Sequence, residues 1–234
     1  MTIAVLDHLS TFPDPNGAED AMGGLLAIGG DLSGERLLEA YRAGVFPWYD
    51  NDSEPVLWWS PDPRAVLEPA AMRVNRSLAK RLRNAGFEIS FDRAFPQVIA
   101  ACATIRRNDN GGPGTWITPN MERAYCGLHA SGYAHSVEVW LNGDLAGGLY
   151  GLSLGEIFFG ESMFSRERDA SKVALYHLCR RLEEWRFRLI DCQLPNEHLQ
   201  SLGVESIPRR EFLAILAQND ESRTRRGNWC REAT

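Results

Sequence analysis

AHSVEVWL (134–141), NG (142–143) and LAGGLYGL (145–152) form the stretch that decides the fold. Two apolar runs flank Asn142-Gly143, and this dipeptide between such runs is a strong signal for a two-residue hairpin turn. We expect SLG (153–155) to make the next turn and EIFFG (156–160) to form a third strand. The stretch therefore predicts consecutive antiparallel strands.

Helices and further strands are predicted on both sides of these strands. Ser33 caps a helix that ends before Gly44, Asp169 caps a long amphipathic helix, and Pro208 opens the last short helix. The expected helices are 33–43, 75–85, 95–104, 120–131, 169–185 and two short ones near the end, and the further strands are 87–91 and 187–193. This order of hairpins, helix and strand predicts an α/β (α+β) sandwich.

The chain has 234 residues, which suits one large domain or one medium domain with a small partner. The segment 46–64, FPWYDNDSEPVLWWSPDPR, is dense in Pro and Trp and links the two parts. We therefore expect a small N-terminal domain over 1–61 and a main domain over 62–234.

The composition excludes several classes of protein. A net charge of −6 argues against coating nucleic acid through bulk charge, although a local basic patch is still compatible with it. No apolar run is long enough to span a membrane, and the N-terminus lacks a basic region typical of signal peptides, so we expect a cytoplasmic protein. The five cysteines include no CxxC pair and the histidines have no ligand spacing, so we expect reduced thiols and no metal.

Four basic residues precede or occupy the 75–85 helix: Arg73, Arg76, Lys80 and Arg83. Their spacing of three and four residues places them on one helix face. A run of this kind is usually a solvated face. Because this stripe contains no acid in a chain that is acidic overall, contact with nucleic-acid phosphates is an equally good interpretation.

Four tryptophans lie in stretches rich in Pro or Gly. For Trp58 and Trp59 we favour core packing. Trp48 and Trp116 lie in predicted loops, and there a ring that stacks on a base or holds an apolar substrate group is the better interpretation.

Two acidic positions are candidates for chemistry. Period-2 geometry places Asp191 and Gln193 on one face at the end of their strand, where polar sites gather in α/β folds. Glu161 follows an apolar strand that we expect to end at Gly160, and a carboxylate in such surroundings is costly unless it is paired.

Two glycine-rich matches are weak. GLSLG (151–155) fits the G-x-S-x-G pattern of serine hydrolases, but strands rather than a strand and a helix surround it. GGLLAIGGD (23–31) lacks the Lys-Ser/Thr of a phosphate loop and is better explained by tight turns before the 33–43 helix.

Ten blocks of the sequence together resemble the bacterial leucyl/phenylalanyl-tRNA–protein transferases, in the order of that family and over nearly the whole chain. The most specific blocks are LWWSPDPR, FGESMFSR and LIDCQ. The others are GGLLAIGGDLS, GVFPW, GTWIT, AHSVEVW, GGLYG, DASK and SLGVESIPRREF.

The resemblance implies a small N-terminal domain followed by a domain similar to the GCN5-related N-acetyltransferase fold. It implies transfer of leucine, phenylalanine or, less well, methionine from aminoacyl-tRNA to the N-terminal Arg or Lys of acceptor proteins, which marks them for degradation. Because the acyl ester is already activated, neither a cofactor nor a metal is required. Acetyltransferases of that fold carry a Gly-rich pyrophosphate loop, which ESMFSRERDAS replaces here.

The resemblance also suggests roles for individual residues. Gln193 would accept a hydrogen bond from the attacking amine, Asp191 would polarise Gln193, and Glu161 would hold a cationic amine. The residues expected to bind the aminoacyl-adenosine are Trp48, Trp116, Met163, Phe164, Ser165 and Asn196, and those expected to hold the tRNA stem are Arg73, Arg76, Lys80 and Arg83. The alternatives are an acetyl-CoA-dependent N-acetyltransferase and a non-catalytic tRNA-binding protein.

Overall fold

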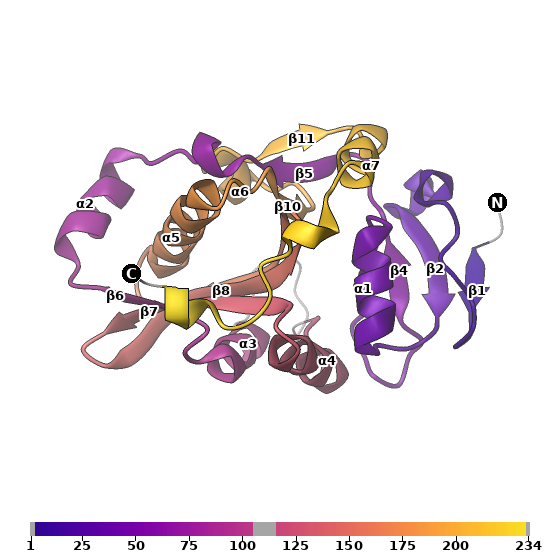
Figure 1. Cartoon of the computed structure of the whole chain (residues 1–234), viewed down its shortest axis with the longest axis horizontal. Helices are drawn as coiled ribbons and strands as arrows, with labels where there is room; N and C mark the ends of the chain where they lie inside the picture. The colour runs from indigo at the N-terminus through magenta and orange to yellow at the C-terminus, as the bar shows by residue number, and fades with distance from the viewer. Residues whose placement is uncertain (1–2, 105–115, 233–234) are drawn as a thin grey trace.

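The computed structural model describes residues 3–104 and 116–232. The N-terminal part forms a four-stranded sheet in the order β1-β2-β4-β3, beside helix α1 (Figure 1). Its elements are β1 (Ala4–Leu6), β2 (Leu25–Gly29), α1 (Gly34–Arg42), β3 (Phe46–Pro47) and β4 (Leu57–Trp59). The predicted cap of α1 is confirmed, since the Ser33 hydroxyl accepts a hydrogen bond from the Arg36 N–H at 3.2 Å.

The rest of the chain builds a seven-stranded sheet in the order β11-β5-β10-β9-β8-β7-β6. Its strands are β5 (Arg64–Leu67), β6 (Glu88–Phe91), β7 (Ala134–Leu141), β8 (Asp144–Leu154), β9 (Ile157–Ser165), β10 (Leu189–Gln193) and β11 (Glu205–Ile207). Neighbours pair antiparallel, except that β9 and β10 are parallel and joined by a helix. The mixed α/β class predicted from the sequence is confirmed.

The hairpin at the centre of the sheet has the predicted turn, because Asn142 and Gly143 both adopt positive φ, 53° and 89°. The second turn lies later than expected: Ser153 and Leu154 still belong to β8, and Gly155 makes the turn at φ 58°. Ser153 therefore lies inside a strand, and GLSLG is no nucleophile elbow.

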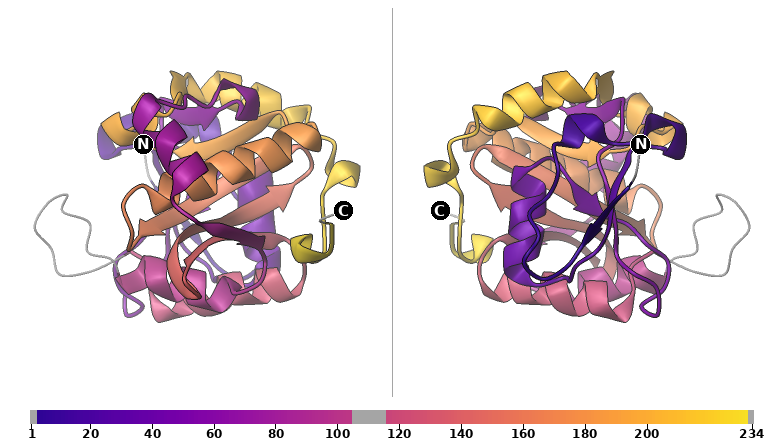
Figure 2. Two further views of the ribbon diagram at one scale, coloured as in Figure 1. Left: turned by 90° about the vertical axis from the view of Figure 1, so that its left-hand side faces the viewer. Right: turned by 90° about the vertical axis from the view of Figure 1, so that its right-hand side faces the viewer.

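Helices cover both faces of the large sheet (Figures 1 and 2). One face carries α3 (Phe95–Thr104) and α4 (Pro119–Ala130), and the other carries α5 (Ala170–Glu184). The expected cap of α5 is wrong in its chemistry. Asp169 occupies the cap position, but it has φ 62° and its carboxylate binds the Lys172 ammonium at 2.9 Å instead of a helix N–H.

The remaining helices lie at the margins of the sheet: α2 (Arg76–Asn84), α6 (Glu197–Ser201) and α7 (Arg209–Ala217). Asn75 caps α2 by accepting a hydrogen bond from the Leu78 N–H at 2.8 Å. Arg73 precedes the helix, and its backbone N–H donates to the Leu202 carbonyl at 2.8 Å. The expectation that Arg73 shares a helix face with the other basic residues is therefore wrong, because α2 starts three residues later.

Apolar packing joins the two sheets. One buried cluster includes Leu37 and Trp58 from the N-terminal part and Phe159 from the large sheet. Trp58 is fully buried and donates from its indole to the Gly29 carbonyl at 2.8 Å, which confirms its packing role. The division at residues 61 and 62 stays a prediction. Within the described ranges, no helix is long and apolar enough to cross a membrane.

Candidate active site

Two β-bulges open the large sheet between β9 and β10. Glu161 has no partner on β8, because Gly160 pairs with Gly151 and Ser162 pairs with Tyr150. On β10, Cys192 is the extra residue between the pairs that Asp191 and Gln193 form with β5. The parallel pairing of β9 with β10 stops at Phe159 and Asp191, just before both bulges. A bulge redirects its side chain and bends its strand, so the two strands separate at this point.

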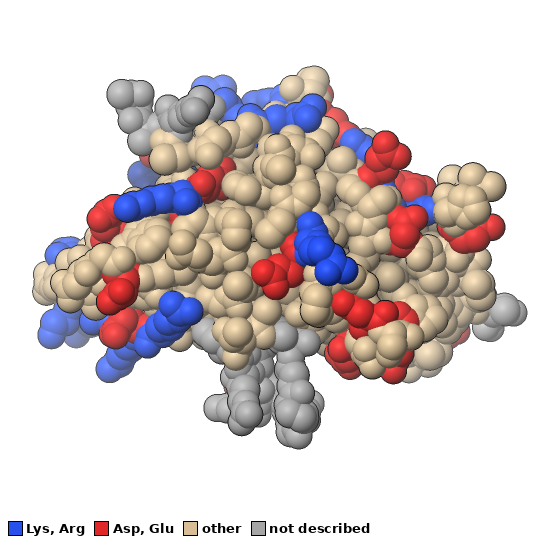
Figure 3. Space-filling model, turned by 90° about the horizontal axis from the view of Figure 1, so that it is seen from below, with Lys and Arg blue, Asp and Glu red and all other residues tan. Residues whose placement is uncertain are grey.

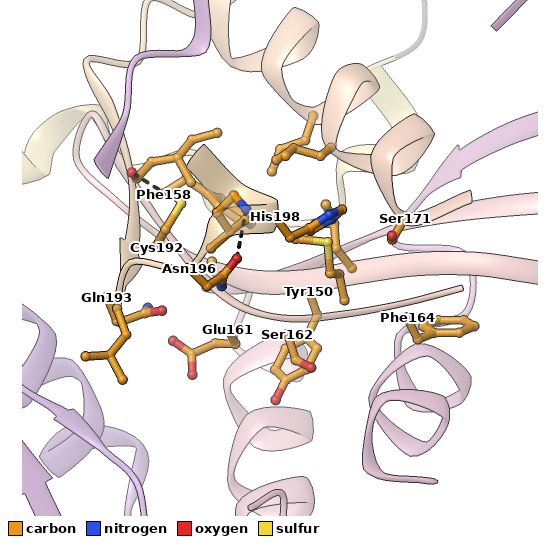
Figure 4. A pocket seen from close by; sticks show the side chains of 18 of the residues that line it. Tyr150, Phe158, Glu161, Ser162, Phe164, Ser171, Cys192, Gln193, Asn196 and His198 are labelled. Carbon is orange, nitrogen blue, oxygen red and sulfur yellow. Dashed lines mark hydrogen bonds between the residues drawn. The ribbon is translucent and has the colours of Figure 1, made fainter. Parts of the chain in front are cut away.

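A cavity of about 980 Å³ lies where the strands separate. Figure 4 shows Gln193 and Glu161 at one end of it and Phe164 and Ser171 at the other. Apolar side chains of the sheet and of α5 line most of it: Leu149, Phe158, Met163, Phe164, Leu175, Leu178 and Ile190. Glu161 and Gln193 therefore lie toward one end of a cavity that is lined mostly by apolar side chains, with further polar groups along its wall, an arrangement typical of substrate pockets.

Glu161 lies within β9 rather than after it, so the expectation that the strand ends at Gly160 is wrong. Its Oε1 accepts a hydrogen bond from the Tyr41 hydroxyl at 2.7 Å, and its Oε2 accepts one from the Tyr125 hydroxyl at 2.8 Å. The two hydroxyls also contact each other. The pairing that this carboxylate requires comes from two tyrosines of α1 and α4, and not from a cation.

Burial raises the pKa of Glu161 to about 7, and the hydrogen bonds from Tyr41 and Tyr125 oppose this rise. The negative charge of Asp191 also raises it, and the positive charge of Arg64 lowers it. Burial likewise raises the pKa of both tyrosines well above its ordinary value, so they stay protonated and donate. Glu161 is thus a carboxyl group whose charge changes near neutral pH, a property common among acid–base residues.

Asp191 is fully buried and does not line the cavity. Arg64, which is equally buried, donates to both of its carboxylate oxygens, from Nε at 2.8 Å and from Nη2 at 2.7 Å. The expectation that Asp191 and Gln193 emerge side by side from one strand face is wrong, because the bulge at Cys192 breaks the period of two. The Asp191 carboxylate contacts Gln193 through the backbone N–H, at 3.0 Å.

Gln193 lines the cavity with its side chain, and its Nε2 is buried without a hydrogen-bond partner among the described residues. The neighbouring Cys192 also lines the cavity. Burial raises the pKa of its thiol, and the negative charge of Asp191 adds to the rise. The thiol therefore stays protonated and is a poor nucleophile.

The predicted substrate-binding residues all line this cavity: Trp48, Trp116, Met163, Phe164, Ser165 and Asn196. Trp48 is 38% exposed at the rim and is supported by Trp59, whose indole N–H donates to the Trp48 carbonyl at 2.7 Å. Asn196 caps α6 by accepting a hydrogen bond from the Leu199 N–H at 2.8 Å.

Tyr41, Tyr125 and Arg64 are site residues that the sequence analysis missed. Each lies far along the chain from its acidic partner, by 120, 36 and 127 positions respectively. Arg64 is the last residue of LWWSPDPR, one of the most specific blocks. Its position in that block is the one feature of the sequence that could have indicated a role at the site. The tyrosines lie in ordinary helical patterns that carry no such signal.

The basic residues Arg76, Lys80 and Arg83 belong to α2, outside the set that lines the cavity. On the face seen from below, Lys and Arg of the described residues are scattered among Asp and Glu rather than gathered (Figure 3). No group of three or more His, Cys, Asp or Glu among the described residues is arranged to hold a metal ion.

Comparison with known proteins gives the family of this mixed α/β chain. Residues 66–217 match the family described as leucyl/phenylalanyl-tRNA protein transferase, and residues 30–62 match its N-terminal domain. The chain belongs to the leucyl/phenylalanyl-tRNA–protein transferase family, as its motifs predict.

Relatives with the name leucyl/phenylalanyl-tRNA–protein transferase match along most of their length. The protein of Thiobacillus denitrificans is 59% identical over 90% of this chain and 91% of its own. That of Azotobacter vinelandii is 58% identical over 91% of this chain and 92% of its own.

Similarity to solved structures is lower. A ribosomal-protein-alanine N-acetyltransferase from Brucella melitensis biovar Abortus has 16% identity and a TM-score of 0.34, over 48% of this chain and 82% of its own. A GCN5-related N-acetyltransferase from Kribbella flavida has 11% identity and a TM-score of 0.39, over 74% of this chain and 59% of its own. TM-scores this low support no conclusion about function.

Proposed function

We propose that this protein transfers a leucyl or phenylalanyl group from its tRNA to the N-terminus of an acceptor protein. The observation that carries the proposal is the cavity of about 980 Å³, apolar along most of its wall and with Glu161 and Gln193 at one end. An apolar aminoacyl side chain fits against the apolar wall, and an amine fits at the end with Glu161 and Gln193. Membership of the family supports the same reaction.

The donor's side chain occupies the apolar part of the cavity. Met163 and Phe164 of β9 and Leu175 and Leu178 of α5 line it without a charged group. An apolar pocket discriminates one methylene only about 10- to 200-fold, so methionine is accepted beside leucine and phenylalanine, less well. Trp48 and Trp116, which both line the cavity, hold the terminal adenosine by stacking.

The acceptor begins with Arg or Lys and approaches from the end with Glu161 and Gln193. Among the described residues that line the cavity, Glu161 and Glu197 are acidic and none is Lys or Arg. Glu161 already accepts hydrogen bonds from two tyrosines, whereas Glu197 is exposed and forms no ion pair within the described part of the chain. The acceptor's amine lies toward Glu161, and its basic side chain lies toward Glu197.

The reaction exchanges an ester for an amide. The neutral α-amine attacks the ester carbonyl carbon, a C–N bond forms, and the bond from that carbon to the ribose oxygen breaks. The amine loses one proton and the ribose oxygen gains one, so charge and atoms balance without ATP or a metal. An α-amino group has a pKa of about 7.7–8.0, so part of it is neutral near pH 7.

The proton of the amine passes to Glu161 rather than to Asp191. Asp191 is saturated by the Arg64 guanidinium and by the Gln193 N–H, and it is shut off from the cavity. Glu161 lines the cavity and has a pKa of about 7. Gln193 accepts a hydrogen bond from the amine through its side-chain oxygen and orients the lone pair toward the ester.

The acceptor stem of the tRNA lies across α2, where Arg76, Lys80 and Arg83 contact its phosphates. Arg73 joins them from the preceding loop. Contacts of this type position the nucleic acid without reading its sequence. The modified proteins are then marked for degradation by their new N-terminal residue.

The test is a label-transfer assay. Purified protein is mixed with tRNA charged with labelled phenylalanine and a peptide that begins with Arg, and the label in the peptide is counted. A matched peptide that begins with Asp is the control. Label in the Arg peptide alone supports the proposal. Label in neither peptide, with intact charged tRNA bound to the protein, makes the chain a tRNA-binding protein without this activity.

A further inference from the structure

Arg64 and Asp191 form a buried ion pair directly behind the cavity. Both side chains are 0% exposed, and the two hydrogen bonds from Nε and Nη2 reach the two carboxylate oxygens at 2.8 and 2.7 Å. This two-bond fork fixes the relative orientation of the two groups as well as their distance. The pair therefore sets the geometry of β10 where that strand leaves β9.

The same guanidinium also holds the N-terminal part of the chain. Its Nη1 donates to the Gly44 carbonyl at 3.0 Å, and its Cζ lies 5.0 Å from the ring of Phe46, a residue that lines the cavity. Its Cζ also lies 4.5 Å from the ring of Phe212. Arg64 thus connects the chain after α1 to β10 through one rigid planar group.

Gln193 depends on this arrangement. Its φ is 57°, a left-handed conformation that residues with a long side chain rarely adopt. Such a conformation persists where the surroundings hold it. Here the Gln193 N–H donates to Asp191 Oδ1 at 3.0 Å, and the same oxygen accepts from Arg64 Nε.

We propose that Arg64 is a positioning residue for the transfer reaction. Acting through Asp191, it holds the Gln193 backbone so that the side-chain amide points into the cavity toward the acceptor amine. Asp191 is then a positioning residue as well, rather than a catalytic one. This inference rests on the proposed function, and neither Arg64 nor Asp191 is among the described residues that line the cavity.

Stability alone does not require this pair. A buried ion pair can often be replaced by apolar residues of similar size without loss of stability, whereas removal of one partner leaves an unpaired buried charge. Two aromatic rings, those of Phe46 and Phe212, lie beside the Arg64 guanidinium. A double variant, Arg64→Met with Asp191→Leu, therefore separates the structural role from the positioning role.

The experiment measures thermal unfolding and the kinetics of phenylalanyl transfer to an Arg peptide for three variants. We expect the double variant to fold with a somewhat lower unfolding temperature, because it also removes the hydrogen bonds to the Gly44 carbonyl and from the Gln193 N–H, and to keep the KM for charged tRNA, while kcat falls roughly a hundredfold. Arg64→Lys keeps the charge without the fork and should lower kcat with unchanged KM. Arg209→Met is the control, because Arg209 is also buried but binds the Ser60 carbonyl and Asp20, neither of which belongs to β10.

Wild-type kcat in the double variant overturns the inference, and so does a loss confined to KM. If the double variant does not fold, Arg64→Lys decides: an unchanged kcat at wild-type unfolding temperature overturns the inference. A wild-type protein that transfers no phenylalanine contradicts the proposed function itself, and the inference falls with it.

Discussion

The hydroxyl of Tyr41, on α1 of the N-terminal part, donates a 2.7 Å hydrogen bond to Glu161 of β9 in the large sheet. The hydrogen bonds to the Glu161 carboxylate therefore come from both the N-terminal part and the rest of the chain. Tyr41 is fully buried, so water cannot replace its hydroxyl, and loss of the hydroxyl would leave Glu161 Oε1 without this partner.

Tyr41→Phe should shift the pH dependence of transfer to higher pH. The Tyr41 hydroxyl stabilises the ionised form of Glu161, so its removal raises the pKa of Glu161 above about 7. The ionised base then appears only at higher pH. The measurement is kcat/KM against pH, and Tyr49→Phe is the control because Tyr49 binds Asp52 and Thr118 instead. A profile that stays in place for Tyr41→Phe argues against Glu161 as the proton acceptor.

Glu161→Gln should lower kcat about 10²- to 10⁴-fold, the usual contribution of a general base. Its pH profile should lose the ionisation near 7 and keep that of the acceptor amine. The thermal stability of Glu161→Gln, in contrast to its kcat, should exceed that of the wild type at high pH. Because the pKa of Glu161 is raised from 4.5 to about 7 in the folded protein, stability falls as pH rises from about 4.5 to about 7, where only the unfolded chain is ionised, and the full loss is present above 7. Thermal scans at pH 5 and pH 8 should show the variant gaining on the wild type at pH 8, and an equal difference at both values would speak against the raised pKa.

Met163→Ala should widen the apolar part of the cavity and change donor preference. Leucine should lose more contact than phenylalanine, so the ratio of kcat/KM for phenylalanyl-tRNA to that for leucyl-tRNA should rise up to about tenfold. The exposed Met22 offers a matched control at Met22→Ala. An unchanged ratio would remove Met163 from the aminoacyl pocket.

Trp48→Ala should weaken binding of the donor by about 1–3 kcal/mol, the value of one base stacked on an aromatic ring. Because the proposed contact of Trp48 is with the terminal adenosine alone, the loss should be equal for charged tRNA and for a minimal donor, phenylalanyl-adenosine. The measurement is KM for each donor. A loss seen with tRNA alone would place Trp48 on another part of the tRNA.

Arg76→Glu combined with Lys80→Glu should weaken binding of charged tRNA and leave phenylalanyl-adenosine unaffected. Each lost phosphate contact reduces the slope of log affinity against log salt by about one. Filter binding between low and moderate salt measures that slope. A slope equal to that of the wild type would move the tRNA away from α2.

The sequence predicted the helices and the strands β6 to β10 because their signals are local, and it missed the short strands β1 to β5 and β11. Asn142-Gly143 marks the central hairpin, Ser33 caps α1, and the pattern after Asp169 marks α5. The length of β9 and the capping chemistry of Asp169 were not predictable, because both depend on tertiary contacts. A strand that continues through Gly160 and a bulged Glu is held by its pairing with β8, and sequence patterns do not show that pairing.

Part of the membership of the candidate site was predictable, but Tyr41, Tyr125 and Arg64 and the geometry of the site were not. The motifs placed Trp48, Trp116 and Met163 at one site, and all three line the cavity. The sequence could not show that Asp191 is a positioning residue rather than a catalytic one. Its ion-pair partner, Arg64, lies 127 positions away along the chain.

The most direct test of the proposed transfer reaction offers two donors to the wild-type protein at once. Phenylalanyl-tRNA and acetyl-coenzyme A are mixed with a peptide that begins with Arg, and the mass of the product peptide is measured. We predict a peptide extended by one phenylalanine and no acetylated peptide. An acetylated product, or an unmodified peptide in the presence of intact phenylalanyl-tRNA, would contradict the proposed function.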